Sequence, residues 1–285
     1  MDISVGLPTT VPGVDGPSLT GFARRAEAHG FAGLGVLDRL VYDNYEPLIA
    51  LAAAAAVTER IRLTTSILIA SYRPSATLLA KQLATIDHIS GGRLSVGLAA
   101  GGREDDYLAA GTTYHDRGRR LDAIVAELRA VWADEGRVPG IGPTPPKGAP
   151  RLLFGGHSPA AMRRAAAHGD GWIAGGGSVT AYADLVRQSL QAWADAGREG
   201  RPHLVSLCYV SLGPDGAARA GDYLRHYYSY VGPKAEYLAR GVIADGGRLR
   251  DAVAGYAEAG CDELILFPCV PEPAQVDLLA EAVPR

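Results

Sequence analysis

Residues 61–99 read IRLTTSILIASYRPSATLLAKQLATIDHISGGRLSVGLA. The two ends of this stretch, 61–70 and 93–99, are short runs of β-branched and apolar residues, which is the composition of buried strands. Between them, residues 75–89 carry apolar side chains at helical spacing. A strand, a helix and a second strand within this length form the repeat of a parallel α/β protein. The stretch therefore predicts one βα repeat followed by the strand of the next.

The same alternation continues along the rest of the chain. Six more runs predict strands at 3–8, 33–37, 151–155, 171–174, 204–212 and 262–268. Helices are expected at 18–29, 46–58, 116–134, 159–168, 179–196, 215–228, about 247–259 and 274–282, with Ser18 as the cap of the first. Eight β and α units in 285 residues favour a closed (β/α)8 TIM barrel that forms a single domain over residues 1–285. An open doubly wound sheet is the alternative, but no Gly-x-Gly-x-x-Gly motif follows the first strand.

Composition excludes several classes of protein. The chain is 47% hydrophobic and 21% charged, which is ordinary for a globular protein. Its 28 basic and 31 acidic residues give a net charge of −3, so we expect neither nucleic acid nor an anionic membrane as a partner. The longest apolar run, near residues 48–57, is too short to span a bilayer, and no basic segment follows Met1. The three cysteines lack metal-ligand spacing, and we predict a cytoplasmic protein.

Residues directly after the strands are the first candidates for a site, because the active site of a TIM barrel lies at the carboxyl ends of its strands. Glycine and other small residues dominate this rim, and carboxylates and histidines that could converge are few. No His-x-His pair or group of rim histidines is present, so we expect no metal site and disfavour a metal-assisted hydrolase. The rim residues are Pro8-Thr9-Thr10, Asp38-Arg39, Ser71-Tyr72-Arg73, Ala100-Gly101-Gly102, Gly155-Gly156-His157-Ser158, Gly175-Gly176-Gly177 and Pro268-Cys269.

One rim segment has the features of an anion site. Residues 155–167 read GGHSPAAMRRAAA, so that two glycines follow a strand and Ser158 and Pro159 open a helix. The unpaired N–H groups and the dipole at such a helix start favour a phosphate. An ordinary capped helix is the alternative interpretation of the same residues.

Two blocks of sequence resemble the luciferase-like flavin-dependent oxidoreductases, a (β/α)8 family. The first block covers residues 71–111 and the second covers residues 150–177, and the resemblance extends over about residues 3–212. The second block is similar to the fifth and sixth strands of the family. The matching residues are Pro74, Ala80-Lys81, Ala84-Thr85-Ile86-Asp87, Ser90-Gly91-Gly92-Arg93, Gly97, Gly111 and Asp170-Gly171-Trp172.

The resemblance implies a flavin site across the mouth of the barrel. The family holds its isoalloxazine ring against a bulge with a non-prolyl cis peptide bond in the third strand, which falls at Ser66–Ile67 here. The family's phosphate-binding position matches Ser158, and its acidic position near the flavin matches Asp106. Asp38, after the second strand, is the other candidate catalytic residue. The implied coenzyme-binding residues are Ser66, Ile67, Ala99, Ala100, Gly101, Gly155, Gly156, His157, Ser158, Gly175 and Gly176.

The chain departs from two branches of the family. Deazaflavin-dependent sugar-phosphate dehydrogenases carry Asp-His after the second strand, where this chain has Asp38-Arg39, and their glutamate after the fourth strand falls on Gly102. Bacterial luciferase carries a His pair after the second strand and an Arg and a Cys on the fourth, where this chain has Ala99-Ala100. These departures argue against both sugar-phosphate oxidation and light emission.

The function that the resemblance implies is that of a flavin-dependent oxidoreductase, with the coenzyme supplying the redox chemistry. We expect a monooxygenase that acts on a small organic substrate with reduced FMN and oxygen. A flavin reductase is the expected partner that supplies the reduced FMN. The alternatives are hydride transfer with coenzyme F420 and a non-catalytic flavin-binding homologue. We also expect a homodimer or another homo-oligomer, with substrate specificity set by residues 136–150 and 229–246.

Overall fold

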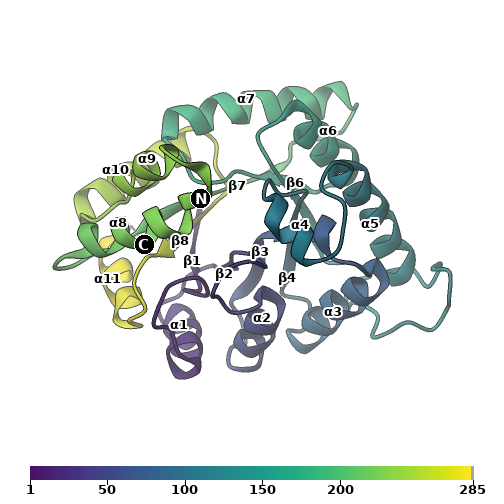
Figure 1. Cartoon of the computed structure of the whole chain (residues 1–285), viewed down its shortest axis with the longest axis horizontal. Coiled ribbons are helices and arrows are strands. Elements are labelled where there is room, and N and C mark those ends of the chain that lie inside the picture. Colours follow the sequence, from purple (N-terminus) through teal and green to yellow (C-terminus); the bar gives the residue numbers. More distant parts are fainter. Residues whose placement is uncertain (284–285) are drawn as a thin grey trace.

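Eight parallel strands close into a barrel in the computed structural model, which describes residues 1–283 (Figure 1). Each strand pairs with the next in the sequence, and β8 closes the ring by pairing with β1. This arrangement confirms the (β/α)8 TIM barrel and rules out the open sheet. The strands are β1 Asp2–Gly6, β2 Gly33–Val36, β3 Arg62–Ile69, β4 Leu94–Ala99, β5 Arg151–Gly155, β6 Gly171–Ile173, β7 His203–Val210 and β8 Glu263–Pro268.

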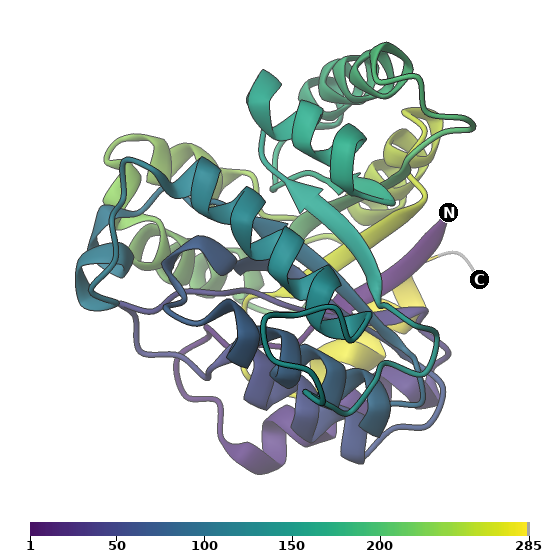
Figure 2. The same cartoon turned by 90° about the vertical axis from the view of Figure 1, so that its right-hand side faces the viewer.

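Helices surround the barrel on the outside, as Figure 2 shows. Nine of them agree with the predicted helices to within about two residues. The structure adds two short helices, α4 and α9, and two 3-10 turns, η1 and η2. The helices are α1 Gly16–Ala28, α2 Pro47–Ala56, α3 Ala76–Ile89, α4 Glu104–Ala109, α5 Arg117–Trp132, α6 Pro159–His168, α7 Val179–Asp195, α8 Gly216–Tyr227, α9 Lys234–Arg240, α10 Gly246–Glu258 and α11 Ala274–Ala282, and the turns are η1 Ala70–Tyr72 and η2 Ser229–Val231.

The start of α1 differs from the prediction. Asp15, and not Ser18, is the N-cap, and its carboxylate accepts a hydrogen bond from the backbone N–H of Ser18 at 2.8 Å. Pro17 lies in the first turn, where the missing N–H of proline costs no intrahelical hydrogen bond. The carboxylate three positions upstream of Ser18 satisfies the helix start.

The helices and strands bury a continuous apolar core between them. Phe22 of α1, Leu51 of α2, Leu83 of α3 and Leu128 of α5 are fully buried against the outward-facing side chains of the strands. A second apolar cluster fills the barrel interior and continues under α8. Burial of this area is the main term that stabilises the barrel and fixes the position of the loops at its mouth.

Strand β3 carries an irregularity at the predicted place. The Ser66–Ile67 peptide bond is cis, as expected. The pairing register between β3 and β4 shifts between Thr65 and Leu68, which is a β-bulge. The backbone of β3 therefore bends next to the mouth of the barrel.

The connection between α5 and β5 lies away from the mouth. It leaves α5 at the amino end of the strands and lies at the outer surface (Figures 1 and 2). The Nζ atom of Lys81 donates a hydrogen bond to Gly142 O at 2.7 Å, and that of Lys147 donates one to Gly92 O at 2.9 Å. The expectation that residues 136–150 set substrate specificity is therefore not supported, because an αβ connection joins the end of the barrel opposite to the site.

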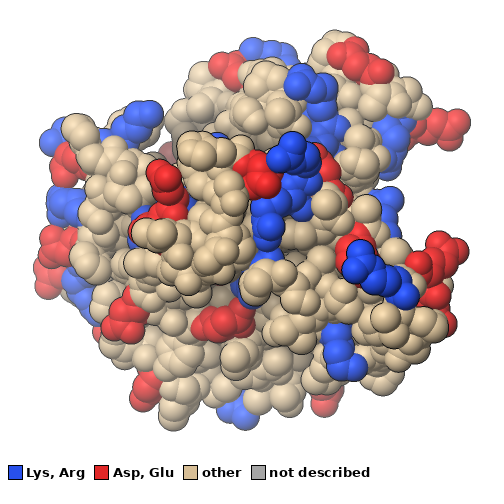
Figure 3. All heavy atoms as spheres, turned by 45° about the vertical axis from the view of Figure 1, so that its right-hand side comes forward, with Lys and Arg blue, Asp and Glu red and all other residues tan. Residues whose placement is uncertain are grey.

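Surface charge and helix length agree with the composition. On the face drawn in Figure 3, basic and acidic side chains are interspersed. Within residues 1–283, no helix is both long enough and apolar enough to cross a bilayer.

A polar cluster closes the amino end of the barrel. Glu263 of β8 is 4% exposed, and Ser4 of β1 donates a hydrogen bond to it. A guanidinium nitrogen of Arg62 lies 3.2 Å from the Glu263 carboxylate, and Nε2 of His203 lies 3.6 Å from it. Burial alone would raise the pKa of the Glu263 carboxyl, but His203, Ser4 and Arg62 together hold this pKa below its ordinary value.

The depressed pKa of Glu263 predicts a pH dependence of stability. A carboxyl with a lower pKa in the folded than in the unfolded protein stabilises the fold above its unfolded pKa, and this contribution is lost as the pH falls through the folded pKa. We expect wild type to be more stable than Glu263→Gln at neutral pH, and the difference to shrink below the ordinary pKa of 4.5. Urea unfolding of both proteins from neutral pH down to about pH 3 measures it. The exposed Glu272→Gln is the control, and an equal pH dependence in all three proteins would contradict the prediction.

Candidate functional site

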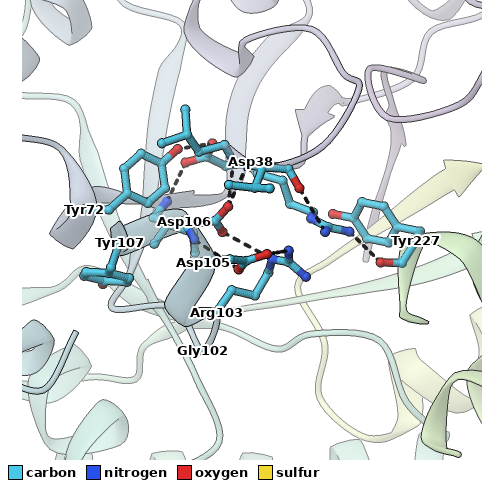
Figure 4. A network of polar contacts seen from close by, with 12 residues as sticks. Asp38, Tyr72, Gly102, Arg103, Asp105, Asp106, Tyr107 and Tyr227 are labelled. Atoms are coloured by element: carbon cyan, nitrogen blue, oxygen red, sulfur yellow. Dashed lines mark hydrogen bonds and ion pairs between the residues drawn. The ribbon is translucent and has the colours of Figure 1, made fainter. Parts of the chain in front are cut away.

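Asp38, predicted as catalytic, lies at the mouth with its carboxylate buried and bonded (Figure 4). Its side chain is 1% exposed. The carboxylate accepts hydrogen bonds from Tyr72 Oη at 2.6 Å and from the backbone N–H of Ile69 at 2.8 Å, and Arg73 Nη2 lies 3.4 Å away. Burial raises the pKa of the Asp38 carboxyl, and Arg73 and Tyr72 oppose that shift. The three donors fix the end of β3 and the turn η1 to the end of β2.

Asp106, the other predicted catalytic residue, is held in a similar way (Figure 4). It lies on α4, which the sequence did not predict, and its side chain is 3% exposed. Its carboxylate accepts hydrogen bonds from the backbone N–H groups of Leu40 at 3.1 Å and Val41 at 2.8 Å, and Nε of Arg103 lies 3.4 Å away. Asp106 therefore ties the segment after β2 to the segment after β4. Both acids lie at the mouth, and hydrogen-bond donors bind both oxygens of Asp38 and one oxygen of Asp106.

The predicted coenzyme residues of β3, β4 and β5 lie side by side. Ser66 is buried and donates a hydrogen bond to Val36 O at 3.3 Å, while the Ile67 side chain is partly exposed. An added Cβ at Gly155 would overlap the end of the Ile67 side chain, so the glycine allows this side chain to cover the backbone of β5. An added Cβ at Gly101 would meet Ile69 at 2.6 Å. Ile67 over Gly155 and Ile69 beside Gly101 make the mouth ends of these neighbouring strands mainly apolar, and we call these four residues the floor.

The remaining predicted coenzyme residues lie at the starts of two neighbouring helices. Ser158 caps α6 by accepting a hydrogen bond from Ala161 N at 3.2 Å, and Ser178 caps α7 by accepting one from Ala181 N, also at 3.2 Å. The imidazole of His157 lies over Gly175, within 3.7 Å of the position of an added Cβ. Partial burial lowers the pKa of His157 below its ordinary value, so the ring is neutral at neutral pH. Two positive helix ends and open glycines meet here, as an anionic group requires.

A wall of tyrosines on the β7 side of the mouth was not predicted. Tyr209 Oη and Tyr228 Oη are 2.6 Å apart, and Thr10 Oγ1 and Tyr223 Oη are also 2.6 Å apart. Burial raises the pKa of each of these three phenols, so they stay neutral donors and acceptors. The run HYYSY at 226–230 was a signal available in the sequence, but the pairing of Tyr228 with Tyr209 of β7 required the three-dimensional structure.

Metal chemistry has no candidate centre in the described part of the chain. Within residues 1–283, no group of three His, Cys, Asp or Glu side chains could hold a metal ion. Cys208, Cys261 and Cys269 are all buried and not bonded to one another. Burial raises the pKa of the Cys261 thiol to about 11, so it is not a nucleophile at neutral pH.

Comparison with protein families gives one match that covers most of the chain. The model of a family described as luciferase-like monooxygenase matches residues 2–266. This range runs from the start of β1 into β8 and includes every predicted site residue.

Similar proteins include both FMN-dependent and F420-dependent enzymes. An uncharacterized protein of Mycobacterium tuberculosis is 32% identical over 230 residues, which cover 69% of this chain and 80% of that protein. An FMNH2-dependent dimethylsulfone monooxygenase of Pseudomonas fluorescens is 32% identical over 139 residues, which cover 45% of this chain and 38% of that enzyme. The solved structure of an F420-dependent secondary alcohol dehydrogenase, in complex with an F420–acetone adduct, superposes with a TM-score of 0.81. It covers 99% of this chain and 97% of its own, and at 18% identity this likeness shows a shared fold.

Proposed function

We propose that this chain, which belongs to the luciferase-like monooxygenase family, is a monooxygenase. It uses reduced FMN and oxygen to oxidise a small organic molecule. The observation that carries the proposal is the meeting of an apolar floor and two helix starts at one end of the barrel. Ile67 and Gly155 belong to the floor, and Ser158 and Ser178 begin the two helices. A flavin mononucleotide combines a flat apolar ring with a phosphate, which is the chemistry that these two regions complement.

The fit to such a coenzyme can be judged from the chain's own groups. The Ser158 hydroxyl uses a lone pair for Ala161 N and keeps its proton free to donate to an anion. Nothing lies within 4 Å of an added Cβ at Gly177, and an added Cβ at Gly175 meets only the His157 ring. Backbone N–H groups of these glycines can therefore be approached closely by a ligand. Ser66, Ile67, Ala99, Ala100 and Gly101 would contact the ring.

When bound and reduced, the coenzyme supplies the electrons that activate oxygen, and the protein's part is binding and orientation. Both rim carboxylates already accept hydrogen bonds, Asp38 from Tyr72 Oη and Ile69 N and Asp106 from the backbone N–H groups of Leu40 and Val41. Oxidation of an alcohol by hydride transfer requires a base for the hydroxyl proton. Because the hydrogen bonds of Asp38 and Asp106 compete with that role, we propose FMN and oxygen first, and His157 is the remaining rim base for the alternative with F420.

We expect Ser158 to contribute to binding through the coenzyme phosphate. Loss of one hydrogen bond to a charged group costs about 1.5–3 kcal/mol, or about ten- to a hundred-fold in affinity. Ser158→Ala should weaken FMN binding by this factor, and Ser158→Asp should weaken it further because it adds a like charge. Binding of riboflavin, which lacks the phosphate, should change little in either variant. Fluorescence titration measures all four affinities.

The matched control is Ser75→Ala, because Ser75 caps α3 by accepting a hydrogen bond from Leu78 N at 3.1 Å and is not among the proposed coenzyme residues. An equal loss of FMN and riboflavin affinity in the Ser158 variants would mean that Ser158 only caps α6. The phosphate would then lie elsewhere.

Turnover with labelled oxygen tests the proposed reaction itself. The protein is supplied with FMN, an FMN reductase and NADH under ¹⁸O₂, with a panel of small organic molecules. We expect a product that carries one labelled oxygen atom. An unlabelled product formed with F420 would support the alternative of hydride transfer, and coenzyme binding without any turnover would support a non-catalytic flavin-binding protein.

The proposal also implies partners. A monooxygenase of this kind needs a supply of reduced FMN, so we propose that a separate flavin reductase acts with it in the cytoplasm. We also propose a homodimer or another homo-oligomer, which light scattering of the purified protein measures directly.

A further inference from the structure

Arg39 is a buried cation without a carboxylate partner. It follows β2 at the mouth of the barrel and is 9% exposed. Its Nη1 donates to Tyr227 O at 2.5 Å and its Nη2 donates to Val41 O at 3.3 Å, while its Nε has no hydrogen-bond partner. Among residues 1–283, no carboxylate forms an ion pair with Arg39, and the neighbouring Asp38 pairs with Arg73 instead. A buried charge in this state is costly unless an anion compensates it.

Tyrosine rings provide part of the compensation. The guanidinium carbon of Arg39 lies 4.3 Å from the ring centroid of Tyr42, 4.9 Å from that of Tyr227 and 5.3 Å from that of Tyr230. Cation–π contacts stabilise the charge. They supply no acceptor for an N–H group, however, and Nε of Arg39 is left without one.

A second arginine lies against the same tyrosine. The guanidinium carbon of Arg103, before α4, is 4.3 Å from the ring centroid of Tyr230, and its side chain is 10% exposed. Arg103 donates a hydrogen bond to Asp105 and pairs with Asp106, as Figure 4 shows. Its Nη1 is nevertheless buried without a hydrogen-bond partner, and its Nε does not have hydrogen-bond geometry toward Asp106. Two cations with unused donors therefore meet at Tyr230.

Apart from the carboxylates of Asp105 and Asp106, the side chains exposed beside the two arginines are large and hydrophobic. Leu40, Val41 and Tyr230 are 45%, 42% and 48% exposed, respectively, although they are large hydrophobic residues. Farther into the barrel, Tyr209 and Phe267 belong to the apolar cluster that Ile67 and Tyr42 join. A ligand at this place would meet positive charge at one end and an apolar surface along the rest of its length.

We propose that Arg39 and Arg103 bind the anionic end of the substrate, a carboxylate or a sulfonate, and that its apolar body lies among the tyrosines toward Ile67. This assignment rests on the proposed function, because it names the substrate class of the same site. An anion supplies acceptors for the unused donors, and the planar fork of arginine suits the two oxygens of a carboxylate or sulfonate. The substrate class is thus a small amphiphilic organic anion.

Binding of matched probes to the full-length protein tests the proposal. Benzoate and benzenesulfonate carry the two anionic groups, and benzamide is the neutral isostere of benzoate. Isothermal titration in the presence and absence of FMN should give one of the anions at least tenfold higher affinity than benzamide. In Arg39→Met, this anion should lose about ten- to a hundred-fold in affinity, the effect of a lost charge-assisted hydrogen bond, and benzamide should lose less than about twofold.

Two further variants keep the test valid if Arg39→Met unfolds. Arg103→Met should lower the affinity for the anion in the same direction and leaves the Arg39 hydrogen bond to Tyr227 O intact. Arg198→Met is the matched control, because Arg198 also lies over an aromatic ring, Trp193 at 4.2 Å, and donates to backbone carbonyls far from the mouth. Anion binding should be unchanged in Arg198→Met.

Three results would overturn the proposal. Equal affinity for benzoate, benzenesulfonate and benzamide would mean that charge is not recognised. Unchanged anion binding in both Arg39→Met and Arg103→Met would place the anion elsewhere. A loss of FMN but not of riboflavin affinity in Arg39→Met would assign the arginine to the coenzyme phosphate. Titration without FMN separates these results from a failure of the proposed function, since the probes can bind even if no flavin does.

Discussion

Replacing Asp38 with alanine should lower the free energy of unfolding by about 3–5 kcal/mol, the effect of breaking a buried ion pair. The substitution removes the acceptor for Tyr72 Oη and for Ile69 N and leaves Arg73 without its buried partner. Tyr72 Oη and Ile69 N would then be buried and unsatisfied, while Arg73 would keep only its ion pair with the half-exposed Glu46 at 3.0 Å. Urea unfolding monitored by circular dichroism measures the loss.

Two controls distinguish the effect on stability of losing the buried hydrogen bonds from the effect of losing a negative charge alone. Asp38→Asn keeps one acceptor oxygen and should cost less than Asp38→Ala. Asp184→Ala removes an exposed aspartate and should change stability by no more than about 0.5 kcal/mol. If Asp38→Ala were as stable as wild type but inactive, Asp38 would be a catalytic group, as the sequence resemblance implies, and not a residue that positions η1.

Replacing Gly97 with alanine should cost about 3 kcal/mol and weaken coenzyme binding. An added Cβ would overlap the carbonyl oxygen of Thr65 and reach the side chain of Ile67 at 3.4 Å. The obstacle is backbone, which cannot rotate away as a side chain can, so β3 would have to move at its bulge. Ile67 is part of the proposed floor, so FMN affinity and stability should fall together.

Gly102→Ala is the matched control for this substitution. Gly102 follows the same strand, and nothing lies within 4 Å of its added Cβ. We expect Gly102→Ala to be as stable as wild type and to bind FMN normally. If Gly97→Ala had normal stability and normal FMN affinity, β3 and β4 would not form a rigid coenzyme floor.

Much of the barrel could be predicted from the sequence, because its strands and longer helices carry strong local signals. Runs such as 151–155 contain apolar residues between turn residues, and the observed β5 has the same bounds. Helix α4 was missed because EDDYLA at 104–109 is short and has no apolar period. Helix α9 was missed for the same reason, since KAEYLAR at 234–240 spans only two turns.

The sequence predicted where the site residues lie, but not how deeply their side chains are buried or which groups they contact. Asp38 and Arg39 were located because the active site of a TIM barrel lies at the carboxyl ends of its strands. The family resemblance located Ser158 and the bulge at Ser66–Ile67. Burial of the Asp38 carboxylate depends on Tyr72 and Arg73, which come from the next βα unit. Arg39 stood out only as a departure from a family pattern. Its contacts with Tyr227 and Tyr230 come from the segment after β7, nearly two hundred residues later, and no local pattern encodes such contacts.

The central claim is that the mouth of this barrel binds a flavin coenzyme by its phosphate and its ring. Its most direct test is a fluorescence-quenching titration of the full-length protein with FMN, riboflavin and F420, each alone. We predict saturable binding of FMN, with riboflavin about ten- to a hundred-fold weaker because it cannot use the charge-assisted hydrogen bonds at Ser158 and the two helix starts. Binding of F420 in place of FMN would correct the choice of coenzyme. Failure of all three ligands to bind would contradict the account.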